Sequence, residues 1–437
     1  MWKPNETQPV LTAEARSDID VAQTRASQEG CKLWPGLAEQ ALASRDKTWQ
    51  WPGLEDRFLP LPGFVWGSFT TDDGAQLRWG HQPVNPARAQ CVLVGGFGEF
   101  IEKQFETIRD LAARGIEVWC LDWRGQGHSA RPRHLPTRPR ARNYERDAAD
   151  LAAFATAKLT LSLPRLLVAH SMGGAIGLIC MRQFPSLFAG AILCSPMLGL
   201  RTGKLPPMLL RCITMPLRVL GLGLCFIPGV RRWSQSCTPS PDRSRVSNDA
   251  KRCRVTHAWV SADPSLRLDG ATFSWLDSAL ALIARIRKPT FLAIIRTPIL
   301  LGTPEREFVV STAAQRLAAR LLQDCTLVEL SESKHDPFLE CDEIREEWLR
   351  RIDAFIAERF PLQSGSHFLM RGVRTGLVSV ENANHLNQRS DGSAQDGMDI
   401  ARDRRAIRSG NPPVSTNRST VISSTIRLRR NHRSASA

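Results

Sequence analysis

The sequence lacks a paired-cysteine motif, and it lacks an apolar run long enough to cross a bilayer. The 11 cysteines among 437 residues are odd in number, and none are spaced as C-x-x-C. Several stand inside apolar segments, where cysteine packs as a small hydrophobe. This usage argues against a disulfide framework and favours a reducing compartment. The longest apolar stretch, residues 205–230, is interrupted by prolines and arginines and falls short of a membrane span.

Signals for secretion and for cofactors are missing as well. Residues 1–20 are polar and lack the apolar core of a secretory signal, so we expect a cytoplasmic protein. No group of His, Cys, Asp and Glu has the spacing of a metal site, and no glycine-rich loop has the pattern that binds nucleotide phosphates. The sequence therefore predicts no metal and no cofactor.

Positive charge is in excess, and much of it is close to the C-terminus. The chain has 58 Lys and Arg against 43 Asp and Glu, and residues 361–437 alone hold twelve arginines against five acidic residues. This segment has no Lys, no Trp and no hydrophobic period, which predicts a disordered tail. A basic tail favours peripheral contact with an anionic membrane, and we expect no nucleic-acid partner. The sequence does not indicate an oligomeric state.

Apolar strands alternate with helices over residues 57–360. A β-hairpin is expected over 64–79, because Asp73-Gly74 supplies the turn. The strands predicted after it cover 90–95, 116–123, 165–170, 189–194, 298–301 and 326–330. The helices predicted between them cover 105–113, 147–159, 172–184 and 313–322, and a last helix follows. Such alternation is typical of a mostly parallel sheet with helices on both faces, an α/β fold.

Two further segments complete the predicted organisation. Residues 1–56 are polar and have no convincing period, so we expect an extension outside the α/β domain. Residues 197–296 contain Pro, Arg and large apolar side chains but few clean strands, which indicates a helical cap inserted over the sheet. Leucines of this cap between 205 and 224 are expected either to wall an acyl-chain tunnel or to pack the cap onto the sheet.

The strongest chemical signal is the segment 167–174, L-V-A-H-S-M-G-G, in which a strand ends at Ser171 and a helix begins behind it. A sharp strand-to-helix turn exposes a serine Oγ above the sheet and requires small residues around it, usually as G-x-S-x-G. Here Ala169 replaces the first glycine and Gly173 is retained. The Met172 amide at the helix start can donate to an oxyanion. The alternative is that Ser171 only caps a buried helix.

A glycine-rich segment, 94–99 (V-G-G-F-G-E), directly follows the first buried strand. A loop at this position can bring a backbone amide to the substrate oxygen, and we predict the amide of Phe97 as the second oxyanion donor. The alternative is an ordinary tight turn, because a glycine cluster alone is weak evidence.

The segment 122–129, D-W-R-G-Q-G-H-S, together with H-S-M-G-G at 170–174, resembles the monoacylglycerol lipase and bacterial lysophospholipase branch of the α/β-hydrolases. The similarity extends in order from Arg57 to Phe360. It implies an α/β-hydrolase fold with an inserted helical cap, and a structural role for 122–129 in ordering a loop near the site. Members of this branch usually have His-Gly before the oxyanion donor, whereas this chain has Gly95 in place of that histidine.

A nucleophilic serine needs a base and an acid that orients the base, and in α/β-hydrolases the chain order is Ser, acid, His. His335 lies in a loop between a late strand and the terminal helix, and its surroundings resemble the His loop of the family. The acid is expected after the strand at 298–301. Alignment on the V-V-S that follows selects Glu307, and alignment on an acid–Arg pair selects Glu305. We prefer Glu307, because its register needs no gap.

The combined prediction is a serine hydrolase that cleaves carboxylic esters through Ser171, His335 and Glu307 and an acyl-enzyme. The amides of Phe97 and Met172 would hold the oxyanion. The resemblance implies a monoacyl lipid substrate, either a lysophospholipid or a monoacylglycerol. Two alternatives stay open: another α/β-hydrolase that cleaves small esters or peptides, and a non-enzymatic protein of the same fold.

Overall fold

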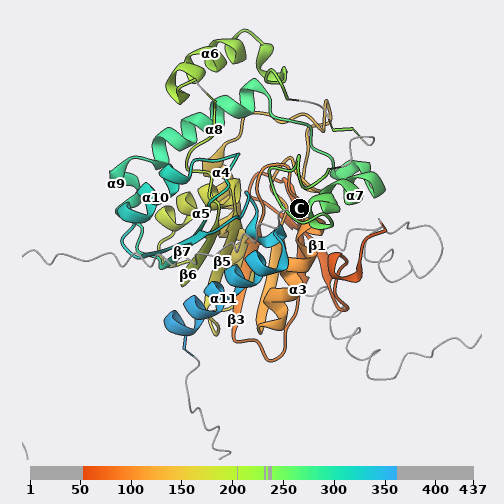
Figure 1. Ribbon diagram of the computed structural model, residues 1–437, viewed down its shortest axis with the longest axis vertical. Helices are drawn as coiled ribbons and strands as arrows, with labels where there is room; N and C mark the ends of the chain where they lie inside the picture. Colours follow the sequence, from red (N-terminus) through yellow and green to blue (C-terminus); the bar gives the residue numbers. More distant parts are fainter. Residues whose placement is uncertain (1–52, 204, 231–232, 235–238, 362–437) are drawn as a thin grey trace, which may run out of the picture. The chain divides into compact units, whose positions relative to one another are not determined.

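An eight-stranded sheet forms the centre of the protein (Figure 1). The computed structural model describes residues 53–203, 205–230, 233–234 and 239–361, which belong to one compact unit. Almost all of the predicted extension (1–56) and of the predicted tail (361–437) lies outside the described residues. The strands are β1 (Val65–Thr70), β2 (Gln76–Gln82), β3 (Ala89–Val94), β4 (Ile116–Leu121), β5 (Arg165–His170), β6 (Gly190–Cys194), β7 (Ile299–Pro304) and β8 (Cys325–Leu330).

The strands lie in the order β1-β2-β4-β3-β5-β6-β7-β8. β1 pairs with β2 as the predicted antiparallel hairpin, and β2 is antiparallel to β4. The other neighbouring pairs of this sheet are parallel. The prediction of a mostly parallel α/β sheet is therefore confirmed. In such a sheet the carboxyl ends of the parallel strands share one edge, which is where α/β proteins place their sites.

Helices connect the strands, and most lie within a few residues of their predicted positions. The α-helices are α3 (Phe105–Ala113), α4 (Tyr144–Lys158), α5 (Met172–Gln183), α6 (Pro207–Val219), α7 (Val255–Ala262), α8 (Phe273–Ile286), α9 (Pro289–Leu292), α10 (Thr312–Leu321) and α11 (Asp342–Arg359). The 3-10 helices are η1 (Asp56–Phe58), η2 (Ile101–Gln104), η3 (Leu222–Leu224), η4 (Arg252–Arg254), η5 (Pro264–Leu266) and η6 (Pro337–Leu339). Side-chain caps mark several starts; the Asn143 side chain accepts from the Arg146 amide where α4 begins.

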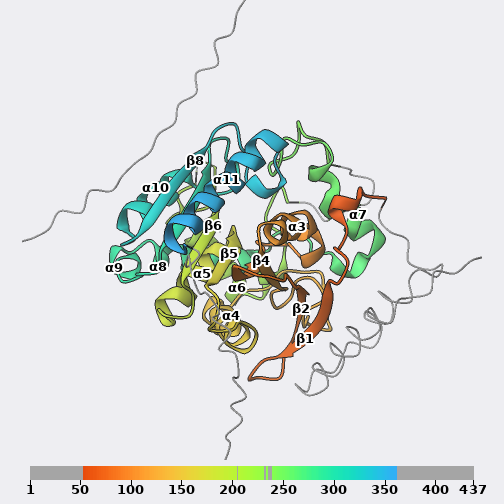
Figure 2. The ribbon, with the colours of Figure 1, turned by 90° about the horizontal axis from the view of Figure 1, so that it is seen from below.

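Both faces of the sheet are covered. Along β3, Val92 and Val94 pack into one core with α4, α5, α8 and α10, whereas Cys91 and Leu93 pack into a second core with α3 and α11. Figure 2 shows α3 and α11 on one side of the strands and α4 and α5 on the other. Because water reaches neither face of the central strands β3, β5, β6 and β7, these strands are mostly apolar, which accounts for their recognition from the sequence.

Helices α6 to α9 lie between β6 and β7, in the segment predicted to form a cap. One face of α8 is buried in the main core, and α6 packs on α8 farther from the sheet (Figure 1). The large apolar side chains on and next to the outer face of α6 are exposed: Leu205, Met208, Leu209, Ile213, Met215, Val219, Leu220 and Leu222. The expectation that the cap leucines pack onto the sheet is therefore wrong for most of them. None of the described helices is both long and apolar enough to span a membrane.

The core on the α11 side provides a stability test. Ile352 on α11 is fully buried, so Ile352→Ala removes apolar contacts and leaves a cavity; we expect the free energy of unfolding to fall by about 2–5 kcal/mol. The matched control is Leu161→Ala, because Leu161 is 85% exposed, and its effect should stay within about 0.5 kcal/mol. Urea denaturation measures both. Equal midpoints for the two variants would contradict the packing of α11.

Candidate active site

Ser171 stands at the sharp turn between β5 and α5. Its φ of 50° is in the left-handed region, which costs a residue with a side chain about 1–3 kcal/mol. Neighbouring backbone is very close: a Cβ at Gly173 would lie 2.6 Å from the carbonyl oxygen of Gly95. Glycine is therefore required at 173, while Ala169 is accommodated, fully buried, at the other small position of the motif.

His335 connects Ser171 to a carboxylate. Its Nε2 lies 3.0 Å from Ser171 Oγ, and its Nδ1 lies 2.8 Å from Glu307 Oε2. Glu307 follows β7, and His335 lies in the loop between β8 and η6. All three side chains belong to buried residues. The structure thus brings together the three residues that the sequence selects for nucleophile, base and acid.

Glu307, and not Glu305, contacts the imidazole. The second oxygen of Glu307 accepts hydrogen bonds from the amides of Val309 (2.6 Å) and Val310 (3.2 Å). Burial raises the pKa of Glu307, but the hydrogen bond from His335 and these two amides outweigh it and hold that pKa below its usual value. Glu305 is exposed and accepts instead from a backbone amide of the loop after β8. The carboxylate beside the imidazole therefore stays ionised at neutral pH.

The D-W-R-G-Q-G-H-S segment holds the glycine-rich loop that follows β3. Trp123 Nε1 donates to the carbonyl of Gly95 at 2.8 Å. Gln126 bridges the loop, because its Nε2 donates to the carbonyl of Gly96 at 2.9 Å and its Oε1 accepts from the amide of Gly98 at 3.0 Å. These contacts agree with the structural role that the family resemblance implies for the segment.

The two amides predicted as oxyanion donors belong to residues next to the serine. A Cβ at Gly96 would lie only 2.9 Å from Ser171 Cβ, so the loop that contains Phe97 passes directly beside the serine. Met172 follows Ser171 and is the first residue of α5. The first amides of a helix have no intrahelical acceptor, so the Met172 N–H is free for a ligand.

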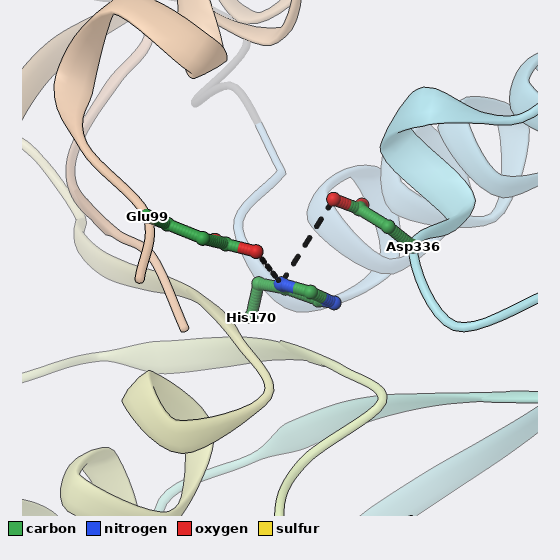
Figure 3. A group of neighbouring side chains, drawn as sticks. All are labelled: Glu99, His170 and Asp336. Carbon is green, nitrogen blue, oxygen red and sulfur yellow. Dashed lines mark hydrogen bonds and ion pairs between the residues drawn. The ribbon is translucent and has the colours of Figure 1, made fainter. Parts of the chain in front are cut away.

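Four charged side chains, three buried and one (Glu99) partly buried, lie next to Ser171 and His335, and Figure 3 shows Glu99, His170 and Asp336. His170 Nδ1 is 2.8 Å from Glu99 Oε1, and His170 Nε2 is 3.2 Å from the carbonyl oxygen of His335. The fourth side chain is Lys103, whose Nζ donates to Asp336 Oδ2 at 2.8 Å and also to Glu99. We call Glu99, Lys103, His170 and Asp336 the charge cluster.

The members of the charge cluster keep one another ionised. Burial lowers the pKa of His170, but the carboxylates of Asp336 and Glu99 outweigh it and raise that pKa to about 9. Burial raises the pKa values of Glu99 and Asp336, yet His170 and Lys103 hold both below their usual range. The pKa of Lys103 is raised, because its two carboxylate partners outweigh burial. At neutral pH the cluster therefore holds two negative and two positive charges.

Three side chains of the charge cluster could also be read as ligands of a metal ion. Glu99, His170 and Asp336 each present one donor atom, and these atoms lie within 4.8 Å of one another. However, the ammonium of Lys103 is bonded to both carboxylates, and it would repel a second cation at close range. The donor set therefore fits an ion-pair cluster better than a metal site.

The sequence interpretation assigned no role to the charge cluster. A partial signal was present, because His170 and Asp336 are chain neighbours of the predicted nucleophile and base, and Glu99 ends the glycine-rich segment. The contacts themselves had no local signal: the ion pair between Lys103 and Asp336 joins residues 233 positions apart.

A cavity of about 350 Å³ lies next to Phe97, within the size range of small-molecule pockets. The rings of Phe97 and Trp275 line it and lie 4.2 Å apart between centroids. Six arginines between β4 and α5 also line it: Arg124, Arg131, Arg138, Arg140, Arg142 and Arg146. Three of these pair with carboxylates, but no carboxylate of the described residues forms an ion pair with Arg131, Arg138 or Arg140.

The mostly parallel eight-stranded sheet and the serine at a strand-to-helix turn define a member of the α/β-hydrolase superfamily. More narrowly, the Hydrolase_4 family (serine aminopeptidase, S33) matches residues 85–342, and the chain belongs to this family.

Individual relatives include lipid hydrolases. A probable lysophospholipase L2 of Haemophilus influenzae is 27% identical over 282 residues, which is 63% of this chain and 86% of that protein. A monoacylglycerol lipase of Mycolicibacterium smegmatis is 29% identical over 125 residues, 28% of this chain and 43% of that protein. Among solved structures, a monoglyceride lipase from Saccharomyces cerevisiae has a TM-score of 0.54 at 19% identity, covering 69% of this chain and 96% of that one. A carboxyl esterase from Bacillus coagulans has a TM-score of 0.55 at 18% identity, covering 69% and 100%. These structural matches establish the fold alone.

Proposed function

We propose that this protein hydrolyses the carboxylic ester of a monoacyl lipid, with Ser171 as nucleophile, His335 as base and Glu307 as the acid that orients the base. The observation that supports it best is the continuous hydrogen-bonded chain from the carboxylate through the imidazole to the hydroxyl. The family and the lysophospholipase and lipase relatives make the chain an ester hydrolase acting on lipid. A non-enzymatic role is disfavoured accordingly.

The proposed reaction is acyl transfer in two halves. His335 Nε2 accepts the proton of Ser171 as Oγ attacks the ester carbonyl, and Glu307 stabilises the imidazolium that forms. The amides of Phe97 and Met172 donate to the oxyanion. The imidazolium then protonates the leaving alcohol. In the second half, His335 deprotonates a water molecule, which attacks the acyl-enzyme and releases the fatty acid and Ser171.

Substitution of each of the two glutamates after β7 tests whether Glu307, and not Glu305, is the acid that orients His335. Glu307→Gln should lower kcat on a soluble ester on the order of 10⁴-fold, because the imidazole loses its orienting carboxylate. Glu305→Gln, the matched control, should stay within about twofold, because Glu305 does not contact the imidazole. Kinetics with a nitrophenyl ester measure both.

A fluorophosphonate probe reports on the nucleophile directly. The wild-type protein should be labelled, and Ser171→Ala should not be. Absence of labelling in the wild type, or equal labelling of Ser171→Ala, would contradict a serine-hydrolase mechanism.

Charge in the cavity beside Phe97 favours a lysophospholipid over a monoacylglycerol. A lysophospholipid has its phosphate a short glycerol linker away from the ester, so a site for it belongs next to the oxyanion donors. Guanidinium groups match phosphate in charge and geometry. Arg138 lies over the Phe226 ring at 4.5 Å and donates to the Leu224 carbonyl, while Arg131 is saturated by backbone carbonyls. We therefore propose Arg138 and Arg140 as the residues that contact the phosphate.

The double variant Arg138→Gln/Arg140→Gln tests this assignment. We expect KM for a short-chain lysophospholipid to rise about tenfold, the value of one lost charge-assisted hydrogen bond, and KM for the matching monoacylglycerol to change less than about twofold. Both substrates are used below their critical micelle concentration, so that binding to a lipid surface does not contribute. Arg316→Gln on α10, whose exposed side chain pairs with Glu329, is the control. Equal changes for the two substrates would contradict a phosphate site.

We also propose that α6 contacts the surface from which the lipid is drawn. Its outer face exposes large apolar side chains, and the helix contains no acidic residue. Its two arginines, Arg211 and Arg218, pair with Asp277 of α8 but are still nearly half exposed. Such a helix suits the interface of an anionic membrane. The basic tail predicted from the sequence favours the same partner.

Vesicle binding distinguishes α6 from the tail. The variant Met208→Asp/Val219→Asp should lower co-sedimentation of the full chain with anionic vesicles several-fold, because two side chains that are 83% and 72% exposed become charged. Leu161→Asp, equally exposed outside the cap, is the control. Loss of binding only on deletion of 361–437 would assign the contact to the tail instead.

A cytoplasmic location is proposed as well. The nine cysteines among the described residues are free thiols, and free thiols persist in reducing compartments.

A further inference from the structure

The charge cluster touches each of the three segments that the proposed reaction requires. Glu99 Oε2 accepts a hydrogen bond from the Gly96 amide at 2.7 Å, next to the proposed oxyanion donor. His170 precedes Ser171 at the end of β5. His170 Nε2 faces the carbonyl of His335, and Asp336 follows that residue in the chain. The cluster therefore connects the oxyanion loop, the serine segment and the histidine loop.

The contacts of His170 require its protonated form. Nδ1 faces a carboxylate oxygen of Glu99, and Nε2 faces the carbonyl oxygen of His335. A neutral imidazole has one N–H group and could donate to only one of these acceptors, whereas an imidazolium donates to both. The two acceptors therefore select the imidazolium on geometry alone.

Glu99 also fills the space above Gly95. A Cβ built at Gly95 would lie 2.7 Å from Glu99 Oε2 and 2.8 Å from Glu99 Cβ. A side chain at this position, such as the histidine usual in the resembling branch, would displace the carboxylate. In this chain the carboxylate of Glu99 therefore holds the loop together with Trp123 and Gln126.

We propose that Glu99, Lys103, His170 and Asp336 act as positioning residues, and that the imidazolium of His170 keeps the oxyanion loop and the His335 loop in register around Ser171. This inference rests on the proposed function of Ser171 and His335. The cluster acts through the backbone of Gly96 and His335 and contacts no substrate, so its effect belongs in kcat rather than in KM.

The proposal makes the reaction sensitive to alkaline pH. His170 has its pKa raised to about 9, so the imidazolium is present below that pH and is lost as the pH rises through it. The groups that face His170 from the surrounding elements are Glu99, Lys103, Asp336, the imidazole of His335, whose ring centroid is 4.8 Å away, and the thiol of Cys194 on β6. Lys103 stays protonated in this range, and burial raises the pKa of Cys194 well above its usual value, so the thiol stays neutral. Deprotonation of His170 therefore leaves one uncompensated negative charge in the cluster.

The experiment measures kcat and KM for a soluble nitrophenyl ester between pH 6 and pH 10.5 in the full chain. Wild-type kcat should fall above pH of about 9, with KM nearly constant. His170→Gln should lower kcat at pH 8 on the order of 10–100-fold and abolish this alkaline decline, since a loop displaced by about an ångström costs that much rate.

Two further variants should move the decline in opposite directions. Asp336→Asn removes a negative neighbour, so the pKa of His170 falls and the decline moves to lower pH. Lys103→Met removes a positive neighbour, so the decline moves to higher pH. A purely packing role could not produce opposite shifts. His81→Gln, which alters a histidine paired with Glu117 at the far part of the sheet, is the matched control and should keep the wild-type profile.

The outcomes separate the two proposals. If the fluorophosphonate does not label wild-type Ser171, the proposed function itself is wrong. If Ser171 is labelled but the alkaline decline is absent, or is unshifted in Asp336→Asn and Lys103→Met, the positioning role is overturned. Circular dichroism at each pH checks folding. Should Lys103→Met fail to fold, the wild-type profile, His170→Gln and Asp336→Asn decide the question by themselves.

Discussion

The backbone turn at Ser171 is the constraint on which the rest of the site depends. Its left-handed conformation lifts the side chain out of the sheet. At the same place the glycine-rich loop after β3 passes the turn at van der Waals distance. The crossing requires glycine at 173 and at 96, because a Cβ at either position would collide with the main chain or with Ser171. The same crossing brings the loop that contains Phe97 directly beside Ser171, and Met172 is the next residue of the chain after that serine. A strained residue persists only where its surroundings leave no alternative, and here closely packed backbone lies on both sides of the turn.

Electrostatics adds a second constraint beside that turn. The charge cluster is largely buried and its charges balance, so each member is held by partners of opposite sign. Balance matters because removal of one partner from a buried ion group costs about 3–5 kcal/mol. The separate pair of Glu307 and His335 is supported by two backbone amides. Six ionised or ionisable groups thus lie close to a hydroxyl that carries no charge in the resting enzyme.

Local sequence patterns predicted much of this architecture. β5 and α3 have the predicted bounds, and the predicted hairpin turn at Asp73-Gly74 joins β1 to β2. These elements are recognisable because burial on both faces leaves continuous apolar segments and glycine marks the breaks. The cap was harder. Its outer face is exposed, contrary to expectation, because an apolar side chain on an inserted helix has the same sequence signal whether it faces the core or the solvent.

Taken alone, the sequence determined that a parallel α/β sheet carries a serine at the end of a buried strand, with a histidine and an acid farther along the chain. Hydrophobic periodicity and turn residues are local properties of the chain, so they can be recognised from the sequence alone. Only the tertiary structure decided which of two nearby glutamates faces His335, since Glu305 and Glu307 differ in which side of the β7 loop they occupy. It also decided that Lys103 and Asp336 form an ion pair beside His170. Ion pairs between distant segments depend on how the strands and loops pack together, and no local sequence pattern predicts that packing.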